Sequence, residues 1–209
     1  MKRFIALAAL MMLASVPLIA QSPKGWKVRA DRSTSASDPD AAGTIKFTTA
    51  GSGFHAVNPQ AAVFWNPGHT VTGLYTLKGT FTLLKPSGHT NYYGLVFGGS
   101  DLEGPAQSYL YFMVAQDGSW LIKRRNGEAT ENVLPKAPSD AVKKPDASGQ
   151  SINALEVRVL PDKIEYVVNG TVVTTTPKTG ATAKTDGLYG IRVNHLLDVQ
   201  IDGLSATKK

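Results

Sequence analysis

The sequence contains no cysteine among its 209 residues, which excludes structural disulfides and a lipid anchor on a cysteine. Charged residues are also scarce, at 18%. Removing the first 20 residues leaves 20 basic and 16 acidic side chains, an excess too small and too dispersed to indicate a nucleic-acid-binding surface. No stretch sustains a helical period of apolar residues, so the sequence predicts no long helices.

The first 20 residues have the layout of a secretory signal peptide. Lys2-Arg3 is followed by the apolar run Phe4–Ala14 and by a plausible cleavage site at residues 18–20. Ser15 and Pro17 interrupt the apolar stretch, which is too short for a membrane span. We therefore expect a secreted or periplasmic protein with a mature N-terminus near Gln21.

The clearest strand pattern lies in residues 153–176. Leu155, Val157 and Val159 alternate with polar residues, as in a strand with one buried face. Asn169-Gly170 readily takes the positive φ angles of a type I′ hairpin. The stretch therefore predicts three consecutive antiparallel strands, whose apolar face must pack on a second sheet.

Other segments repeat this pattern, and the predicted strands include Leu74–Leu84, Tyr92–Phe97, Tyr109–Ala115, Leu188–Asn194 and Leu197–Ile201. Two of these, Tyr92–Phe97 and Tyr109–Ala115, are nearly apolar on both faces and suit central strands. Asn66-Pro67-Gly68 indicates a turn that ends the apolar run Ala61–Trp65. Gly79 suggests a bulge or a close backbone approach within its strand.

Two stretches read as irregular. Residues 21–43 are polar and predict an arm, with one short strand near Trp26–Arg29. Ala129–Gln150 contains three prolines, which exclude a long helix or a central strand. We expect a surface excursion there, with a single helical turn near Ser139–Lys143. Residues 44–209 then form one domain.

Many short strands with turns every 8 to 12 residues predict an all-β, two-sheet antiparallel jelly-roll sandwich. An immunoglobulin-like sandwich is the alternative, although about 100 residues suffice for it. The runs Tyr109-Leu110-Tyr111-Phe112, Trp120-Leu121-Ile122-Lys123 and Val167-Val168-Asn169-Gly170 resemble the concanavalin A-like/laminin-G-like jelly roll.

More narrowly, the chain is similar to bacterial secreted domains labelled 3-keto-disaccharide hydrolase-like or family 16 glycoside hydrolase-like. The resemblance covers roughly Gly43 to Leu204. It implies the sandwich fold but not an activity, because this fold hosts lectins, hydrolases and adhesion modules.

Retaining β-glucanases of this fold carry a Glu-x-Asp-x-x-Glu pattern, which is absent here. Asp101 and Glu103 are two apart, but the adjacent Gly104-Pro105 indicates a solvated loop. No Gly-x-Ser-x-Gly elbow supports serine catalysis. The sequence therefore predicts no catalytic residue.

The sequence also predicts no metal site. The four histidines, His55, His69, His89 and His195, lack the close spacing of a helical zinc motif. We interpret them as separate exposed or hydrogen-bonded residues. Laminin-G-like domains often hold calcium, for which Asp101, Asp117, Asp186 and Asp198 are candidates by residue type alone. No cofactor is expected.

Sugar binding uses aromatic faces for stacking and polar groups for the hydroxyls. The predicted ligand-binding residues are Trp65, Tyr92, Tyr93, Arg124, Arg192, Asn194 and His195. Arg192 and Asn194 share one strand face because they are two apart. Trp120, in contrast, is expected to pack in the core.

The sequence thus favours a secreted, non-catalytic β-sandwich that binds a carbohydrate or a cell-surface glycan. A glycoside-processing hydrolase of the 3-keto-disaccharide type is the first alternative. A structural module without a small ligand is the second.

Overall fold

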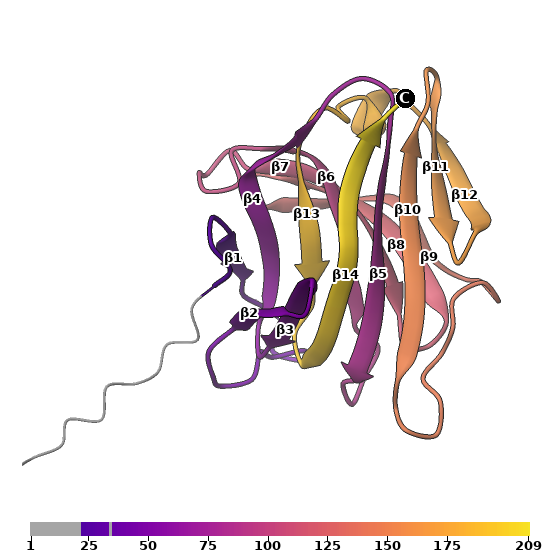
Figure 1. Cartoon of the computed structure of the whole chain (residues 1–209). Helices are drawn as coiled ribbons and strands as arrows, with labels where there is room; N and C mark the ends of the chain where they lie inside the picture. The colour runs from indigo at the N-terminus through magenta and orange to yellow at the C-terminus, as the bar shows by residue number, and fades with distance from the viewer. Residues whose placement is uncertain (1–21, 34) are drawn as a thin grey trace, which may run out of the picture.

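The computed structural model describes residues 22–33 and 35–209, so the predicted signal peptide, residues 1–20, lies outside the described residues. Two antiparallel sheets of seven strands each pack face to face (Figure 1). Within the described residues, the single helical element is a 3-10 turn over Gly180–Thr182. The prediction of an all-β, two-sheet antiparallel sandwich is confirmed. No helix in the described part of the chain is long and apolar enough to cross a membrane.

We call the two sheets sheet 1 and sheet 2. In spatial order, sheet 1 consists of β1 (Lys27–Asp31), β4 (Ala61–Val71), β13 (Gly187–Val193), β6 (Tyr92–Ser100), β7 (Ser108–Ala115), β8 (Ser119–Asn126) and β9 (Ala129–Pro138). Sheet 2 consists of β12 (Thr171–Pro177), β11 (Lys163–Val168), β10 (Ser151–Val159), β5 (Tyr75–Lys85), β14 (Leu197–Lys208), β3 (Gly53–Asn58) and β2 (Lys46–Ala50).

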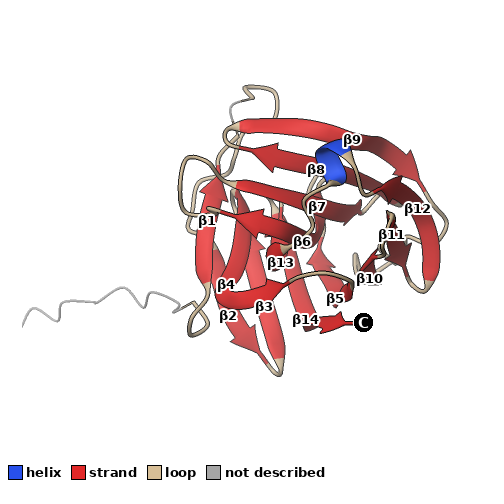
Figure 2. Ribbon diagram, turned by 90° about the horizontal axis from the view of Figure 1, so that it is seen from above, coloured by secondary structure: helices blue, strands red, loops and turns tan. Residues whose placement is uncertain are grey.

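Figure 2 shows β6, β7 and β8 in one layer and β3, β14 and β5 in the other. The core lies between the layers because alternate side chains of each strand point inward. Phe64, Leu95 and Phe112 of sheet 1 and Phe81 and Tyr166 of sheet 2 are fully buried there. Each such side chain contributes about 1.5–3 kcal/mol through removal of apolar surface from water.

The predicted three-stranded meander is present as β10, β11 and β12, paired in that order. Asn169 and Gly170 form the two-residue connection between β11 and β12, with φ angles of 49° and 84°. These positive angles confirm the predicted tight hairpin. The sequence has the same residue pair at Asn126-Gly127, but there only Gly127 has a positive φ, 57°, so the turn after β8 is of a different type.

The prediction that a turn at Asn66-Pro67-Gly68 ends the strand is wrong. β4 continues through it to Val71, and residues 66–69 bulge out opposite the single residue Tyr189 of β13. Proline is tolerated at such a bulge because the ladder hydrogen bonds are interrupted there. An irregularity does occur at Gly79: two residues of the neighbouring strand β14, between Asp202 and Ser205, lie opposite this one glycine, so the extra residue of the bulge belongs to β14.

Both stretches that the sequence marked as irregular contribute a strand to sheet 1. β1 lies within residues 21–43 and pairs with β4, so the sandwich begins before residue 44. β9 forms the first part of the supposed excursion and pairs with β8 at the sheet's edge. Its two prolines, Pro135 and Pro138, are compatible with an edge strand, which needs fewer ladder hydrogen bonds. The expected helical turn is a hydrogen-bonded turn in which Val142 N donates to Ser139 O.

Candidate functional site

The outer face of sheet 1, which points away from sheet 2, is far more buried than an outer face usually is. Its apolar side chains form a second cluster, separate from the core: Val63, Trp65, Val96, Leu102, Tyr109, Tyr111, Met113 and Leu121. All eight are at most 5% exposed, although no third layer of strands or helices covers them among the described residues. This burial explains why β6 and β7 read as apolar on both faces.

The curvature of sheet 1 closes this outer face. Asp31 on β1 lies 3.2 Å from Arg125 on β8, across four intervening strands. Neighbouring strands are about 4.8 Å apart, so a flat sheet would separate β1 and β8 by roughly 24 Å. Arg29 of β1 also donates to the carbonyls of Leu102 and Gly104, at 3.1 and 2.7 Å, in the loop after β6. The outer face is therefore strongly concave, and side chains bridge it.

Arg192 of β13 lies at the centre of the concave face and is 7% exposed. It donates to Asp31 Oδ2 at 2.6 Å and to the Tyr109 hydroxyl at 3.0 Å. Its guanidinium carbon is 5.2 Å from the centre of the Tyr111 ring, within cation–π range. Burial alone lowers the pKa of Arg192, but Tyr109, Asp31 and Tyr111 raise it by more, so the side chain stays charged.

The same environment affects the neighbouring titratable groups. Burial raises the pKa of the Tyr109 hydroxyl, and the positive charge of Arg192 only partly opposes this shift. Burial also lowers the pKa of Lys123, and Arg192 lowers it further. Arg192 therefore stays a cation beside the neutral hydroxyl of Tyr109.

Two polar cavities lie at this face, and Arg192 lines the smaller one. One, of about 270 Å³, is lined by polar residues that include Asp31, Asp38, Asp40, Asn91, Arg192, Asn194 and His195. The other, of about 640 Å³, is lined by residues that include Arg29, Arg125, Glu128 and Thr130. Asp31 and Arg32 border both. Two residues that line the smaller cavity each have a buried side-chain atom, Arg192 Nε and Asn194 Oδ1, with no hydrogen-bond partner within the described ranges.

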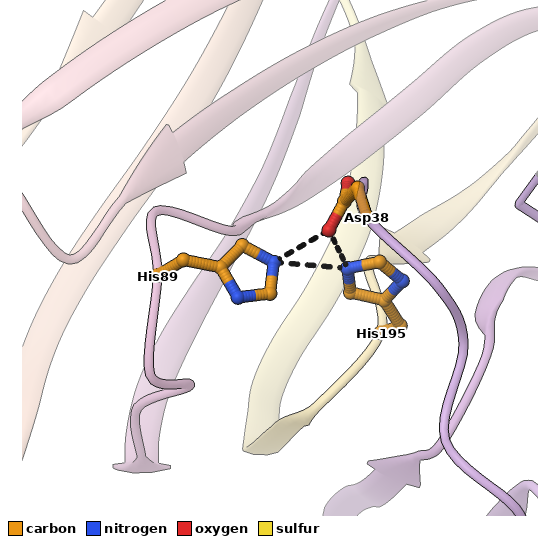
Figure 3. Close-up of side chains that lie close together, drawn as sticks. All are labelled: Asp38, His89 and His195. Carbon is orange, nitrogen blue, oxygen red and sulfur yellow. Dashed lines mark hydrogen bonds and ion pairs between the residues drawn. The ribbon is translucent and has the colours of Figure 1, made fainter. Parts of the chain in front are cut away.

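Asp38, His89 and His195 converge at the smaller cavity (Figure 3). Asp38 Oδ1 lies 2.8 Å from His89 Nε2 and 3.0 Å from His195 Nε2. The two Nε2 atoms are 3.1 Å apart. Asp40 Oδ1 lies 3.0 Å from the other ring nitrogen of His195, Nδ1. Carboxylate and imidazole atoms in this arrangement can bind a metal ion.

The seven predicted ligand-binding residues are not all in one place. Arg192, Asn194 and His195 line the same cavity. Trp65 and Tyr92 belong to the outer cluster, but Trp65 is only 2% exposed. Tyr92 is partly buried and lies 3.4 Å from the Ser119 hydroxyl.

Two of the predicted residues point to the wrong side of sheet 1. Tyr93 is fully buried in the core, where its hydroxyl accepts from Asn153, so it cannot contact a ligand. Arg124 pairs with Leu110 across the strands and therefore faces the inner side, where it lies 3.8 Å from Glu131. The alternation in each strand explains both corrections, since Tyr92 and Arg125 take the outer positions.

Sequence reasoning missed the acidic half of this site. Asp31, Asp38 and Asp40 lie in the polar stretch that was interpreted as an arm. His89 and His195, interpreted as separate, meet across 106 positions of the chain. No local spacing could reveal this contact, although the repeated aspartates around Pro39 were a visible signal.

The remaining predicted sites are dispersed. The four aspartates considered for calcium form no cluster within the described residues. Asp117 is bound by Lys136, and Asp198 lies 2.5 Å from His55 Nε2. Burial lowers the pKa of His69, whose ring stacks on Tyr189. These residues lie outside the two cavities of the concave face.

No protein-family model matches the chain, and no curated protein matches it. Solved structures do. The carbohydrate-binding module CBM66 from Bacillus subtilis aligns over 88% of this chain and 96% of its own, with a TM-score of 0.63 and 10% identity. The chain has a concanavalin A-like jelly-roll fold. A family 16 endo-glucanase from Bacteroides ovatus aligns with this jelly roll over 90% of the chain and 96% of its own, with a TM-score of 0.61 and 11% identity. The Emp46p carbohydrate recognition domain aligns over 87% of each chain, with a TM-score of 0.57 and 10% identity.

Proposed function

We propose that the chain is a secreted, non-catalytic jelly roll that binds a carbohydrate or cell-surface glycan in the concave face of sheet 1. One observation carries this proposal. Arg192, Asn194 and His195, which the sequence marked as a sugar-recognition set, line one polar cavity together with Asn91. A guanidinium, two amides and an imidazole offer the donors and acceptors that sugar hydroxyls require.

Two unpaired polar atoms of residues that line the cavity support the same function. Arg192 Nε is a donor and Asn194 Oδ1 is an acceptor, and neither has a partner among the described residues. An unpaired buried polar group costs about 1–3 kcal/mol. A hydroxyl both donates and accepts, so a bound sugar can recover part of this cost once neighbouring side chains shift to admit it.

The proposed binding differs from the sequence expectation in its chemistry. Trp65 and Tyr93 are buried, so stacking on their rings does not contribute. Hydrogen bonds and the charge of Arg192 would provide most of the affinity, with Tyr92 as the one predicted aromatic that is partly exposed. We therefore expect weak binding that is selective for hydroxyl arrangement.

Hydrolysis is the less favoured function because the cavity offers no free acid. A glycosidase needs one protonated carboxyl group and one carboxylate on either side of the bond. Here Asp31 accepts from Arg192 and forms an ion pair with Arg125, while Asp38 and Asp40 lie against histidine nitrogens. Carboxylates that are engaged as acceptors or paired with nitrogens do not supply the proton that a leaving group needs.

A glycan array with the mature protein tests the proposal, followed by incubation of each hit with the protein. We expect binding without release of reducing ends or of a 3-keto sugar. Asn91→Ala and Asn194→Ala should weaken binding, whereas Asn132→Ala, on the exposed edge strand β9, should not. Arg192→Lys tests the guanidinium while keeping the charge beside Asp31.

Each other outcome points to a different function. Sugar release would replace the binding module by a hydrolase. Equal binding by all three asparagine variants would place the site away from this cavity. Absence of binding to every glycan would favour a structural module.

A further inference from the structure

The atoms Asp38 Oδ1, His89 Nε2 and His195 Nε2 lie 2.8–3.1 Å from one another and come from three different connections. Asp38 lies between β1 and β2, His89 between β5 and β6, and His195 between β13 and β14. Figure 3 shows the three side chains pointing toward a common centre. The fold, rather than local sequence, brings them together.

The positions of the ring protons show that none of these three atoms donates a hydrogen bond to another. Asp40 Oδ1 is 3.0 Å from His195 Nδ1, so this ring nitrogen carries the proton. In a neutral imidazole the other nitrogen, Nε2, then has a lone pair and acts as an acceptor. The Asn91 amide donates to His89 Nε2 at 3.0 Å, which makes that atom an acceptor as well. Three acceptors, one of them on a carboxylate, therefore face each other, and a cation between them would remove the repulsion.

The distances suit a metal ion. Ligands at about 2.0–2.1 Å from a tetrahedral zinc ion are roughly 3.3 Å apart, so a slight widening of the observed cluster creates the site. Two nitrogens and one oxygen favour zinc and related transition metals over calcium or magnesium, which prefer oxygen ligands alone. Asp40 orients His195 through its far nitrogen, as outer carboxylates do for metal-binding histidines.

We propose that Asp38, His89 and His195 bind one divalent transition-metal ion, with Zn²⁺ as the preferred ion. Three protein ligands leave a fourth coordination position for water or a ligand atom. The bound ion would hold the segment between β1 and β2 against the β5–β6 and β13–β14 connections. Metal binding shares His195 with the proposed sugar site. Its test is a Zn²⁺ titration without any glycan, so the two proposals can fail separately.

Calorimetric titration of the chelator-treated mature protein with Zn²⁺ tests this site. We expect one equivalent of Zn²⁺ to bind and to raise the thermal midpoint, while Ca²⁺ does neither. His89→Ala and Asp38→Asn are suitable variants because both side chains are about half exposed, at 45% and 49%, and should leave the fold intact. Mutation of a carboxylate that only orients a ligand typically lowers metal affinity about 10–100-fold, and we expect a loss of that size for Asp40→Asn. His89→Ala and Asp38→Asn remove a ligand and should each lower Zn²⁺ affinity by more.

His55→Ala is the matched control. His55 is also paired with an aspartate, Asp198, but lies on sheet 2, so its removal should leave Zn²⁺ binding unchanged. Unchanged affinity in His89→Ala and Asp38→Asn would overturn the proposal. So would the absence of stoichiometric binding by the parent protein, which would mean that protons alone hold the cluster together.

Discussion

Asp31 and Arg125 form an ion pair with a 3.2 Å separation between strands that four other strands keep apart in the sheet. The pair holds because sheet 1 curls strongly and because Arg125, only 8% exposed, is anchored by a second bond to the Gly127 carbonyl at 2.8 Å. Asp31 also accepts from Arg192. One carboxylate thus links an edge strand to the middle and the far side of the concave face.

Removing this carboxylate should be costly. Asp31→Ala leaves Arg125 and Arg192 buried without their partner, and we expect a loss of about 3–5 kcal/mol in the free energy of unfolding. Urea denaturation measures it. Glu128→Gln serves as a control, because Glu128 also pairs with Arg125 but is 78% exposed and should contribute less than about 1 kcal/mol. Similar losses for both variants would contradict a closed concave face.

Asn153 should be the most sensitive polar position in the core. It is fully buried and makes four hydrogen bonds, two of them with the backbone of Lys143 and one each with Asn169 and Tyr93. Asn153→Leu keeps the side-chain volume but leaves these partners without a hydrogen bond, so we expect the free energy of unfolding to fall by about 3 kcal/mol or more. Ile152→Ala is a neighbouring control, since Ile152 is 54% exposed and should change stability by less than about 0.5 kcal/mol. Thermal and urea unfolding should agree on this difference.

The hairpin at Gly170 should depend on backbone angle alone. A side chain at Gly170 would meet no atom within 4 Å, yet its φ of 84° is strained for any other residue. Gly170→Val should therefore lower stability by about 1–3 kcal/mol. Gly88→Val is the matched control, because Gly88 has equally open space and no positive φ. Equal melting temperatures for the two variants would show that the positive φ at position 170 causes no backbone strain.

Asp117 should make stability depend on pH in the acid range. Burial raises the pKa of Asp117, but hydrogen bonds from Lys136 and Ser119 outweigh it and lower the pKa from 3.8 to about 2. Between these values the unfolded chain binds the extra proton, so this contribution is complete above about pH 4 and is lost as the pH falls to about 2.

Because Asp117 is 32% exposed, solvent screening limits the contribution to about 1 kcal/mol. Urea unfolding between pH 2 and 5 should show the parent protein gaining this amount relative to Asp117→Asn. Parallel stability curves for the two proteins would count against the hydrogen-bonded carboxylate.

Export should remove the first 20 residues. Lys2-Arg3 and the apolar run after them predict a cleaved signal, with Gln21 at or near the mature N-terminus. Intact-mass measurement of the exported protein checks the cleavage position. An exported form that still begins at Met1 would show that the interpretation is wrong.

The sequence by itself determined many of the strands and the buried face of the meander. Alternation at Leu155, Val157 and Val159 and the turn at Asn169-Gly170 are local properties, so the meander could be predicted. The apolar character of β6 and β7 likewise predicted burial on both sides. These features need only the period of a strand and the φ preferences of single residues.

Only the tertiary structure decided which polar residues meet. The curl of sheet 1 brings Asp31 to Arg192 and Arg125, and three separate connections bring Asp38, His89 and His195 together. Long-range contacts of this kind leave no spacing in the sequence. The same reason explains why Tyr93 was misplaced: a shift of one residue moves a side chain to the opposite face, and pairing with neighbouring strands fixes that register.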